Sequence, residues 1–272
     1  MIGKFNFSVI LPVYKKVDFI DFSNSLNSIL FQKLQADEII VIYDGPVNLK
    51  IKNYVKKMMK KFKILKTINF SRNKGLGSIL RYGIRKAKFP YIARCDADDI
   101  SLPHRFYEQV NYLKKNSKID VLSSNVLEKF ENIKTTKKKI PQYHFQIKKK
   151  IFFRNPINHN SVIFRKEKIL KSGNYKSMPF FEDYYLWFRV LKNGGKFYNL
   201  QKNHVTMKID KSYYARRSGL KYYRYYLNFL NRLNKQNMIP YYIYLFNLIL
   251  RFNIIFIPKK ILIKFYNYFL RN

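Results

Sequence analysis

Acidic residues are scarce in this chain of 272 residues, in which 16 Asp and Glu stand against 54 Lys and Arg and give a formal net charge of +38. Such an excess ordinarily indicates nucleic acid or an anionic membrane surface as the partner. Only 14 of the basic residues are Arg, and the Lys residues are spread along the chain without a recognition helix, a zinc finger or an RNA-binding aromatic motif. We therefore expect no nucleic-acid partner.

Cysteine is nearly absent as well. Cys95 is the only one, which excludes a disulfide within the chain and indicates a reducing compartment. The apolar run near the amino terminus is too short for a signal peptide and is interrupted by Pro12. We expect a cytoplasmic protein, and we expect Cys95 to pack in the core.

Apolar runs long enough to span a membrane are also missing. The segment between Pro240 and Pro258 is strongly apolar, but Asn247, Arg251 and Asn253 interrupt it, and a spanning helix needs about 20 mostly apolar residues. We expect two or three amphipathic helices in this part of the chain.

The sequence leaves two alternative locations for these carboxyl-terminal helices. They pack on the rest of the protein, or they lie peripherally on the cytoplasmic face of the inner membrane with Lys259, Lys260 and Lys264 at anionic headgroups.

The 47% hydrophobic fraction is enough to fill a core. Over the first 120 residues, strand-like apolar runs alternate with amphipathic helical stretches, which is typical of a parallel sheet covered by helices. The expected strands are Phe7 to Val13, Glu38 to Tyr43, Lys63 to Asn69 and Tyr91 to Cys95. The expected helices are Phe19 to Phe31, Leu49 to Phe62, Leu76 to Ala87 and Pro103 to Asn116.

Three of the few acids lie directly after the fourth expected strand, at Asp96, Asp98 and Asp99. Like charges packed side by side need a compensating cation, and Mg²⁺ or Mn²⁺ takes carboxylate oxygens and shares them with a substrate's phosphates. A plainer alternative is that Asp99 caps the next helix while the other acids face water. Arg94 and Arg105 flank the cluster and could orient its carboxylates, although surface ion pairing is the simpler expectation for Arg105.

Glu182 and Asp183 form a second acidic site at the start of an expected helix that ends at Gly194 and Gly195. Acids are favoured at a helix amino end by roughly 0.3 to 1 kcal/mol, so this pair also has a purely structural explanation.

Taken together, these motifs make the chain resemble the family 2 glycosyltransferases, in particular bacterial members that build lipopolysaccharide, O-antigen and capsule. The resemblance covers roughly residues 5 to 217. The residues that carry it are Phe7 to Tyr14, Asp37 to Pro46, Asn73 to Gly77, Ile92 to Ile100 with Pro103 and Arg105, Asn155 to His159, and Glu182 to Arg189 followed by Gly194 and Gly195.

The resemblance implies a glycosyltransferase-A (GT-A) fold, an α/β class in which a Rossmann-like, mostly parallel sheet is flanked by helices. Residues 1–217 would form the catalytic domain, with a nucleotide-sugar half over about 1–100 and an acceptor half over about 101–217. Residues 218–272 would form a carboxyl-terminal α-helical extension.

The resemblance also assigns roles to residues. Pro12, Tyr14 and Asp44 would hold the nucleotide base, although Tyr43 stands where many relatives carry a further Asp. Other contacts to the nucleotide sugar would come from Arg72, Asp96, His159 and Arg217.

In the same scheme Asp98, with Asp96 and Asp99, would hold a divalent metal, Mn²⁺ or Mg²⁺, that neutralises the departing nucleoside diphosphate. Asp183 would be the general base and Glu182 the alternative base or a positioning group.

The expected function is therefore an inverting transfer of a sugar, from a UDP-hexose or a UDP-N-acetylhexosamine, to a hydroxyl of a glycan acceptor that is free or lipid-linked. Two rivals remain. A nucleotidyltransferase would use paired acids too, but the loop Leu11 to Lys16 lacks the glycines that its phosphate site needs. A non-enzymatic basic protein that binds nucleic acid or membrane would explain the charge but not the two acidic motifs.

Overall fold

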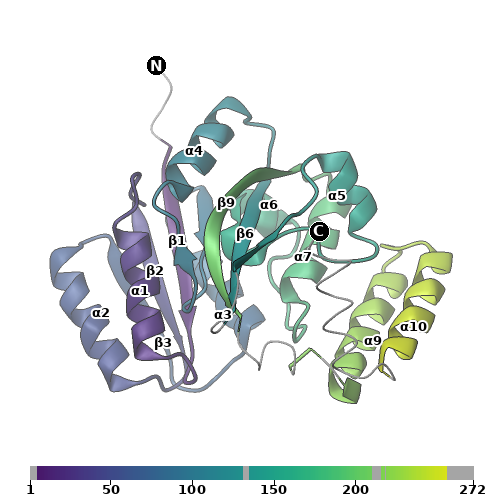
Figure 1. The fold of residues 1–272 in the computed structure, drawn as a ribbon, viewed down its shortest axis with the longest axis horizontal. Helices are drawn as coiled ribbons and strands as arrows, with labels where there is room; N and C mark the ends of the chain where they lie inside the picture. Colours follow the sequence, from purple (N-terminus) through teal and green to yellow (C-terminus); the bar gives the residue numbers. More distant parts are fainter. Residues whose placement is uncertain (1–4, 131–134, 210–215, 218, 256–272) are drawn as a thin grey trace.

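The structure is a computed structural model that describes residues 5–130, 135–209, 216–217 and 219–255. Its centre is one mixed sheet in the order β3-β2-β1-β4-β8-β6-β9-β5, with β7 paired to β6 (Figure 1). The strands are β1 (Phe7–Val13), β2 (Glu38–Asp44), β3 (Leu65–Phe70), β4 (Tyr91–Arg94), β5 (Ile100–Ser101), β6 (Val121–Phe130), β7 (Thr135–Lys138), β8 (Ile163–Arg165) and β9 (Phe197–Ile209).

The amino-terminal half of the sheet is parallel. β1 pairs with β2 on one side and with β4 on the other, and β2 pairs with β3. β1 and β2 are buried along their whole length and mostly apolar, as expected for parallel strands covered on both faces. The four strands expected from the sequence are confirmed, with ends that differ by one or two residues.

Beyond β4 the sheet becomes mixed. β8 is antiparallel to β4 and to β6, while β6 and β9 run parallel over ten paired positions with a bulge near Asn125. The short β5 pairs with β9 directly after the acid cluster, so the loop from Asp96 to Asp99 is fixed at both ends by the sheet.

Helices cover both faces of the sheet and enclose two cores. α1 (Phe19–Leu30), α2 (Leu49–Lys61) and α4 (Arg105–Lys115) bury their apolar stripes on one face. The other face is covered by α3 (Leu76–Lys86), α5 (His144–Lys150), α6 (Lys166–Lys171), α7 (Glu182–Lys192) and α9 (Gly219–Lys235). The expected helices of the first half are confirmed, and α7 ends ahead of Gly194, which has a φ of 71°.

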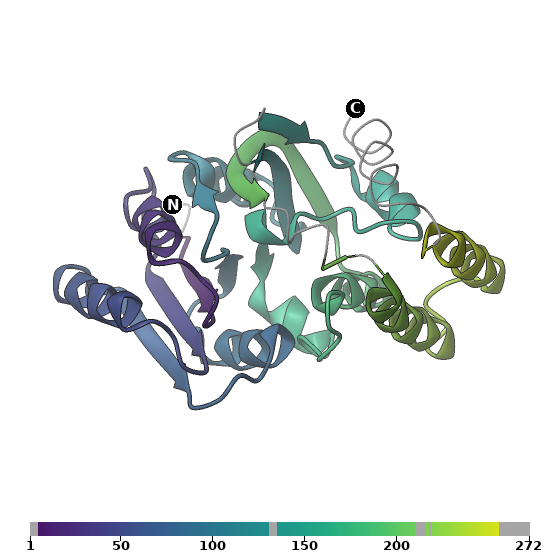
Figure 2. The same ribbon diagram turned by 60° about the horizontal axis from the view of Figure 1, so that its bottom comes forward.

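The carboxyl-terminal part of the described chain is a pair of packed helices, α9 and α10 (Tyr241–Ile255), at the edge of the molecule beside α7 (Figures 1 and 2). Phe229 of α9 stacks on Phe181 with ring centroids 5.0 Å apart and also meets Tyr184, so α9 packs against the start of α7. Within the described residues no helix has both the length and the apolar character that crossing a membrane requires. Lys259, Lys260 and Lys264 lie outside the described residues.

Candidate active site

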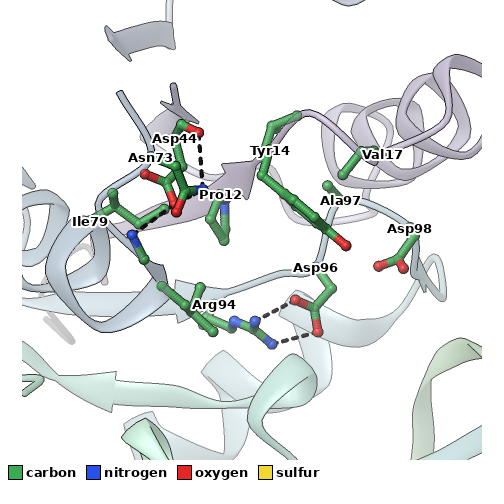
Figure 3. Close-up of a pocket in the computed structure, with 13 residues that line it drawn as sticks. Pro12, Tyr14, Val17, Asp44, Asn73, Ile79, Arg94, Asp96, Ala97 and Asp98 are labelled. Atoms are coloured by element: carbon green, nitrogen blue, oxygen red, sulfur yellow. Dashed lines mark hydrogen bonds and ion pairs between the residues drawn. The ribbon is translucent and has the colours of Figure 1, made fainter. Parts of the chain in front are cut away.

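A cavity of about 320 Å³ opens at the carboxyl ends of β1, β2 and β4, where open α/β sheets bind their ligands (Figure 3). Five of the predicted site residues, Pro12, Tyr14, Asp44, Asp96 and Asp98, line it. The remaining lining residues are Val13, Val17, Asn73, Gly75, Leu76, Ile79, Arg94 and Ala97.

Asp44 forms one wall of this cavity and organises the loop that follows β3. Its carboxylate accepts hydrogen bonds from the Lys74 backbone N–H at 2.6 Å, the Gly75 N–H at 3.1 Å and the Asn73 side-chain amide at 2.9 Å. These bonds hold the loop at the amino end of α3 against the sheet. The carboxylate of Asp44 is therefore pre-oriented, and the loop between β3 and α3 is tied to it.

Gly45 makes the close approach of this loop possible. Its φ is 84°, and a Cβ there would lie 2.7 Å from the Asn73 backbone nitrogen. Arg72, predicted to lie near the base or the diphosphate, is exposed in the same loop and is not among the residues that line the cavity.

At the opposite wall, Arg94 orients Asp96. The Arg94 side chain is almost fully buried, its Nη1 donates to an Asp96 carboxylate oxygen at 2.6 Å, and its Nη2 pairs with the second oxygen (Figure 3). A bidentate pair of this kind fixes both the position and the rotation of the carboxylate. The expectation that Arg94 could orient the carboxylates of the cluster is thus confirmed for Asp96.

Asp98 and Asp99 occupy different surroundings although they are adjacent. Asp98 is exposed at the rim of the cavity, and partial desolvation together with the neighbouring Asp96 raises its pKa to about 6. Asp99 is buried and accepts from the Asn160 side-chain amide at 2.5 Å and from the Lys208 backbone N–H at 3.2 Å. Burial and the two neighbouring carboxylates raise the pKa of Asp99 well above its usual value.

These surroundings fit a divalent cation whose ligands come only partly from the protein. Within the described chain, no group of three or more His, Cys, Asp and Glu side chains is arranged to hold a metal. Mg²⁺ is nevertheless bound in many enzymes by one or two carboxylates and completed by substrate phosphates and water. Asp98, an exposed carboxylate whose ionisation is disfavoured, would hold such a cation, with Asp96 beside it, and the cation would supply Lewis-acid stabilisation of a phosphate leaving group.

The second acidic site begins α7. Asp183 accepts a hydrogen bond from the Asn155 side-chain amide at 2.7 Å. Burial raises its pKa while the Asn155 bond lowers it, with a net upward shift. Burial and the adjacent Asp183 raise the pKa of Glu182 to about 7. Both carboxyl groups therefore bind a proton more readily than ordinary carboxylates do.

Gly77 in the first turn of α3 brings this acidic pair toward the cavity. A Cβ at Gly77 would lie 3.0 Å from Cγ of Glu182 and 2.7 Å from the Lys176 carbonyl oxygen. Since Gly75 and Leu76 line the cavity, Glu182 packs against the same end of α3 that forms its wall.

His159 does not line the cavity, and the structure pairs it with a residue that the sequence reasoning did not single out. Its Nε2 lies 2.6 Å from the Tyr175 hydroxyl, and burial, with the Arg94 charge, holds the pKa of His159 well below its usual value. His159 is therefore neutral at physiological pH. Tyr175 lies in a loop with no motif of its own, and only the fold shows its role.

Arg217, the remaining predicted contact, is exposed and is also outside the set that lines the cavity. It lies on the side of Asp183. Burial lowers the pKa of Lys138 to about 8, with contributions from the charges of Arg154 and Arg217, while Glu128 and Asp183 oppose this shift.

The surface ion pairing expected for Arg105 is wrong. Arg105 is fully buried and donates to the Arg94 carbonyl at 2.8 Å, to the Ser101 hydroxyl at 2.9 Å and to the Cys95 sulfur at 3.2 Å. It therefore holds the strand that delivers the acid cluster. Cys95 is buried as expected, and burial raises the pKa of its thiol.

A Rossmann-like sheet with an Asp-x-Asp cluster at its carboxyl edge and a second acidic pair beside the same cavity defines a nucleotide-dependent transferase. The model of the protein family Glycosyl transferase family 2 matches residues 8–173 of this chain. The chain belongs to this family and is a glycosyltransferase, as the sequence motifs predicted.

Two curated relatives cover much of the chain. The UDP-Gal:alpha-D-GlcNAc-diphosphoundecaprenol beta-1,3-galactosyltransferase of Escherichia coli is 32% identical over 257 residues, which are 93% of this chain and 92% of the relative. The amylovoran biosynthesis glycosyltransferase AmsE of Erwinia amylovora is 33% identical over 203 residues, 75% of each chain.

Solved structures agree on the fold. Staphylococcus aureus TarS 1-349 in complex with UDP-GlcNAc superposes with a TM-score of 0.64 at 17% identity, covering 84% of this chain and 66% of that one. The mannosyltransferase PcManGT of Pyrobaculum calidifontis in complex with GDP-Man and Mn²⁺ gives 0.64 at 14% identity, covering 85% and 64%. The predicted GT-A fold is confirmed, and this chain spans about two thirds of each solved chain.

Proposed function

We propose that this glycosyltransferase moves a sugar from a UDP-linked donor to a hydroxyl of a lipid-linked glycan acceptor in the synthesis of a bacterial surface polysaccharide, with inversion at the anomeric carbon. The donor and acceptor classes are supported by the Escherichia coli galactosyltransferase, whose name includes both a UDP-sugar and a diphosphoundecaprenol acceptor. The alignment covers 92% of that relative, so the similarity extends over nearly all of its length.

One observation carries the proposal: two acidic motifs 85 positions apart in sequence, at Asp98 and Asp183, are both influenced by the charge of the buried Arg94. Burial raises the pKa of Asp98, Glu182 and Asp183, and the charge of Arg94 opposes the rise in all three. A leaving-group site and a proton acceptor in one neighbourhood are what a single displacement at a sugar carbon requires.

In the proposed reaction the nucleotide lies in the cavity between Tyr14, Asp44 and Asp96. Asp183 removes the proton of the acceptor hydroxyl, and the hydroxyl oxygen forms a bond to the anomeric carbon from the face opposite the diphosphate. The bond between that carbon and the diphosphate oxygen breaks, and UDP leaves with the electron pair. Asn155 holds Asp183 in position. Asp98, on the leaving-group side, would hold Mg²⁺ or Mn²⁺, which would stabilise the negative charge of the departing diphosphate.

The test is UDP release by the purified chain across a panel of UDP-sugars, with Mg²⁺, Mn²⁺ or chelator. Asp98→Ala, Asp183→Asn and Glu182→Gln are compared with Glu167→Gln, which removes an exposed i,i+4 ion pair with Lys171 far from the cavity. We expect one donor to be hydrolysed slowly and only with metal.

The variants separate the roles. Asp98→Ala should lose metal-dependent release, Asp183→Asn should retain donor binding but lose transfer to acceptor, and Glu167→Gln should match the native chain. Absence of binding and turnover with every UDP-sugar would overturn the donor assignment, and equal transfer rates for Asp183→Asn and the native chain would overturn Asp183 as the base.

A further inference from the structure

α10 is mostly apolar along its described length, yet only one side of it is covered within the described chain. Ile243 and Asn247 are buried against α9, while the opposite side exposes Tyr242 to 72% and Ile249 to 65%. We call this side the outer face of α10. Its exposed residues are Tyr241, Tyr242, Leu245, Phe246, Ile249, Leu250 and Phe252.

A contiguous exposed apolar surface on a folded protein marks an interaction site. The outer face of α10 therefore has an occupant that the packing of α9 does not supply.

The outer face continues onto the end of α5. Phe153, 48% exposed, meets Phe246 edge-to-face with ring centroids 6.2 Å apart. The buried Asn247 amide donates to the Phe152 carbonyl at 3.1 Å, which fixes α10 to this turn. Lys148, Lys149 and Lys150 are exposed in the last turn of α5, directly before it.

The surroundings of this surface carry charge of one sign. Within the described chain, residues 219–255 contain five Lys and Arg and no Asp or Glu, and residues 135–166 likewise contain no acid. A second copy of this chain would bring the same cations to the same place and be repelled. An anionic lipid surface is complementary to both the cations and the apolar side chains.

We propose that the outer face of α10 docks the enzyme on an anionic bilayer, lying in the plane of the interface with Phe153 beside it and with Lys148, Lys149 and Lys150 at lipid phosphates. Along its described length α10 buries one side against α9 and exposes the other, which suits a helix lying in the plane of the surface. The tyrosines and phenylalanines suit the boundary between headgroups and acyl chains.

Two successive helix contacts connect the outer face of α10 to the candidate active site. α10 packs on α9, and Phe229 of α9 packs on Phe181 and Tyr184 at the start of α7, where Asp183 lies. If the acceptor is lipid-linked, as the proposed function has it, docking would bring the membrane to the acceptor side of the enzyme. Docking itself needs no substrate.

Vesicle flotation of the full chain, without nucleotide or acceptor, tests the inference. Vesicles of phosphatidylcholine alone are compared with vesicles containing about one third phosphatidylglycerol. The variant Leu245→Ser/Phe246→Ser/Ile249→Ser removes apolar contacts from the outer face of α10. Its matched control, Ile20→Ser/Phe31→Ser/Leu49→Ser, alters the same three residue types at positions in and beside α1 and α2 that are at least as exposed.

We expect the native chain and the control to bind anionic vesicles and the α10 variant to bind about tenfold or more weakly, because three apolar side chains no longer enter the interface. Lys148→Glu/Lys149→Glu/Lys150→Glu should weaken binding to anionic vesicles and leave the weak binding to phosphatidylcholine unchanged. Circular dichroism and UDP release verify that each variant is folded.

Equal vesicle binding by the α10 variant and the control would overturn the inference, as would native binding that ignores phosphatidylglycerol content. Light scattering that shows a native dimer, converted to monomer by the α10 substitutions alone, would assign the surface to self-association instead. Each of these results leaves the proposed sugar transfer untouched, because neither measurement depends on turnover.

Discussion

The carboxylates of this active site differ in what holds them, and that difference decides what each can do. Asp96 is clamped by Arg94, Asp99 is bound by Asn160 and the backbone of Lys208, and Asp183 accepts from Asn155. Asp98, by contrast, is exposed at the cavity rim with a pKa raised to about 6. This difference is consistent with the proposed roles, in which Asp98 holds a cation and Asp183 accepts a proton.

The substitution Asn155→Ala tests whether Asn155 controls the ionisation of Asp183, the proposed base. The Asn155 amide stabilises the charged form of Asp183 and so opposes the upward shift in pKa that burial produces. Without it the pKa of Asp183 rises further. A base acts only when ionised, so the acidic limb of the kcat profile should move to higher pH, while the KM for the donor stays the same.

The control for this change is Asn116→Ala, which removes an exposed side-chain bond to the Tyr112 carbonyl at the end of α4. It should leave the pH profile unchanged. An acidic limb at the native position in Asn155→Ala would show that Asp183 is not the group whose ionisation limits turnover.

Arg94→Lys should weaken donor binding. A single ammonium cannot reproduce the paired bonds from Nη1 and Nη2 to the two oxygens of Asp96. A hydrogen bond to a charged group contributes about 1.5 to 3 kcal/mol, so we expect roughly a 10- to 100-fold rise in the Kd for the nucleotide sugar, measured by calorimetry. Arg165→Lys, which alters the Arg165–Asp120 ion pair away from the cavity, should bind the donor as the native chain does.

At the scale of the element, α9 supports α7, the helix that carries Asp183, the proposed base. Phe180 adopts a φ of 70° just before α7, and its ring packs on Tyr222 and Tyr225 of α9. A positive φ at a residue with a side chain costs energy, so the conformation persists only because its surroundings enforce it. The position of Glu182 and Asp183 thus depends on packing against α9.

Phe229→Ala should therefore lower both stability and activity. The ring is buried and stacks on Phe181, so its removal should reduce the free energy of unfolding by about 3 to 5 kcal/mol in urea denaturation. Leu220→Ala, on the same helix but 64% exposed, should change it by less than about 0.5 kcal/mol. If Phe229→Ala were as stable as Leu220→Ala, α9 would not be part of the core.

The sequence predicted those helices and strands whose own hydrophobic pattern determines their secondary structure. β1 and β2 are continuous apolar runs bounded by turn residues, and α7 has helical spacing and a glycine stop, so all three were readable. β9 is 13 residues long and mostly polar, and it is a strand because it pairs with β6. Arg94 is two positions from Asp96, so their pairing could be expected from the sequence. Tyr175 and His159 are 16 positions apart and meet only in the fold, so their pairing leaves no signature in a single sequence.

At the scale of the whole molecule, the net charge of +38 acts on stability as well as on binding. With only 16 acids for 54 bases, most cations have no acidic partner in the sequence, and the compact state repels itself. The Debye length falls from about 30 Å at 0.01 M salt to about 8 Å at 0.15 M, so added salt screens this repulsion. The exposed ion pairs that salt would also screen, such as Lys208–Asp21 and Lys171–Glu167, are worth at most about 1 kcal/mol each.

The melting temperature should therefore rise as NaCl increases from 0.01 M to 0.3 M, with most of the rise below 0.15 M, where the screening length changes most. Tetramethylammonium chloride at equal ionic strength should produce the same rise, since the effect depends on the anion atmosphere around a cationic protein and not on the cation added. Differential scanning fluorimetry at constant pH measures both series. A melting temperature that falls with salt would mean that the sixteen acids are so well paired that local attraction outweighs the repulsion among fifty-four bases.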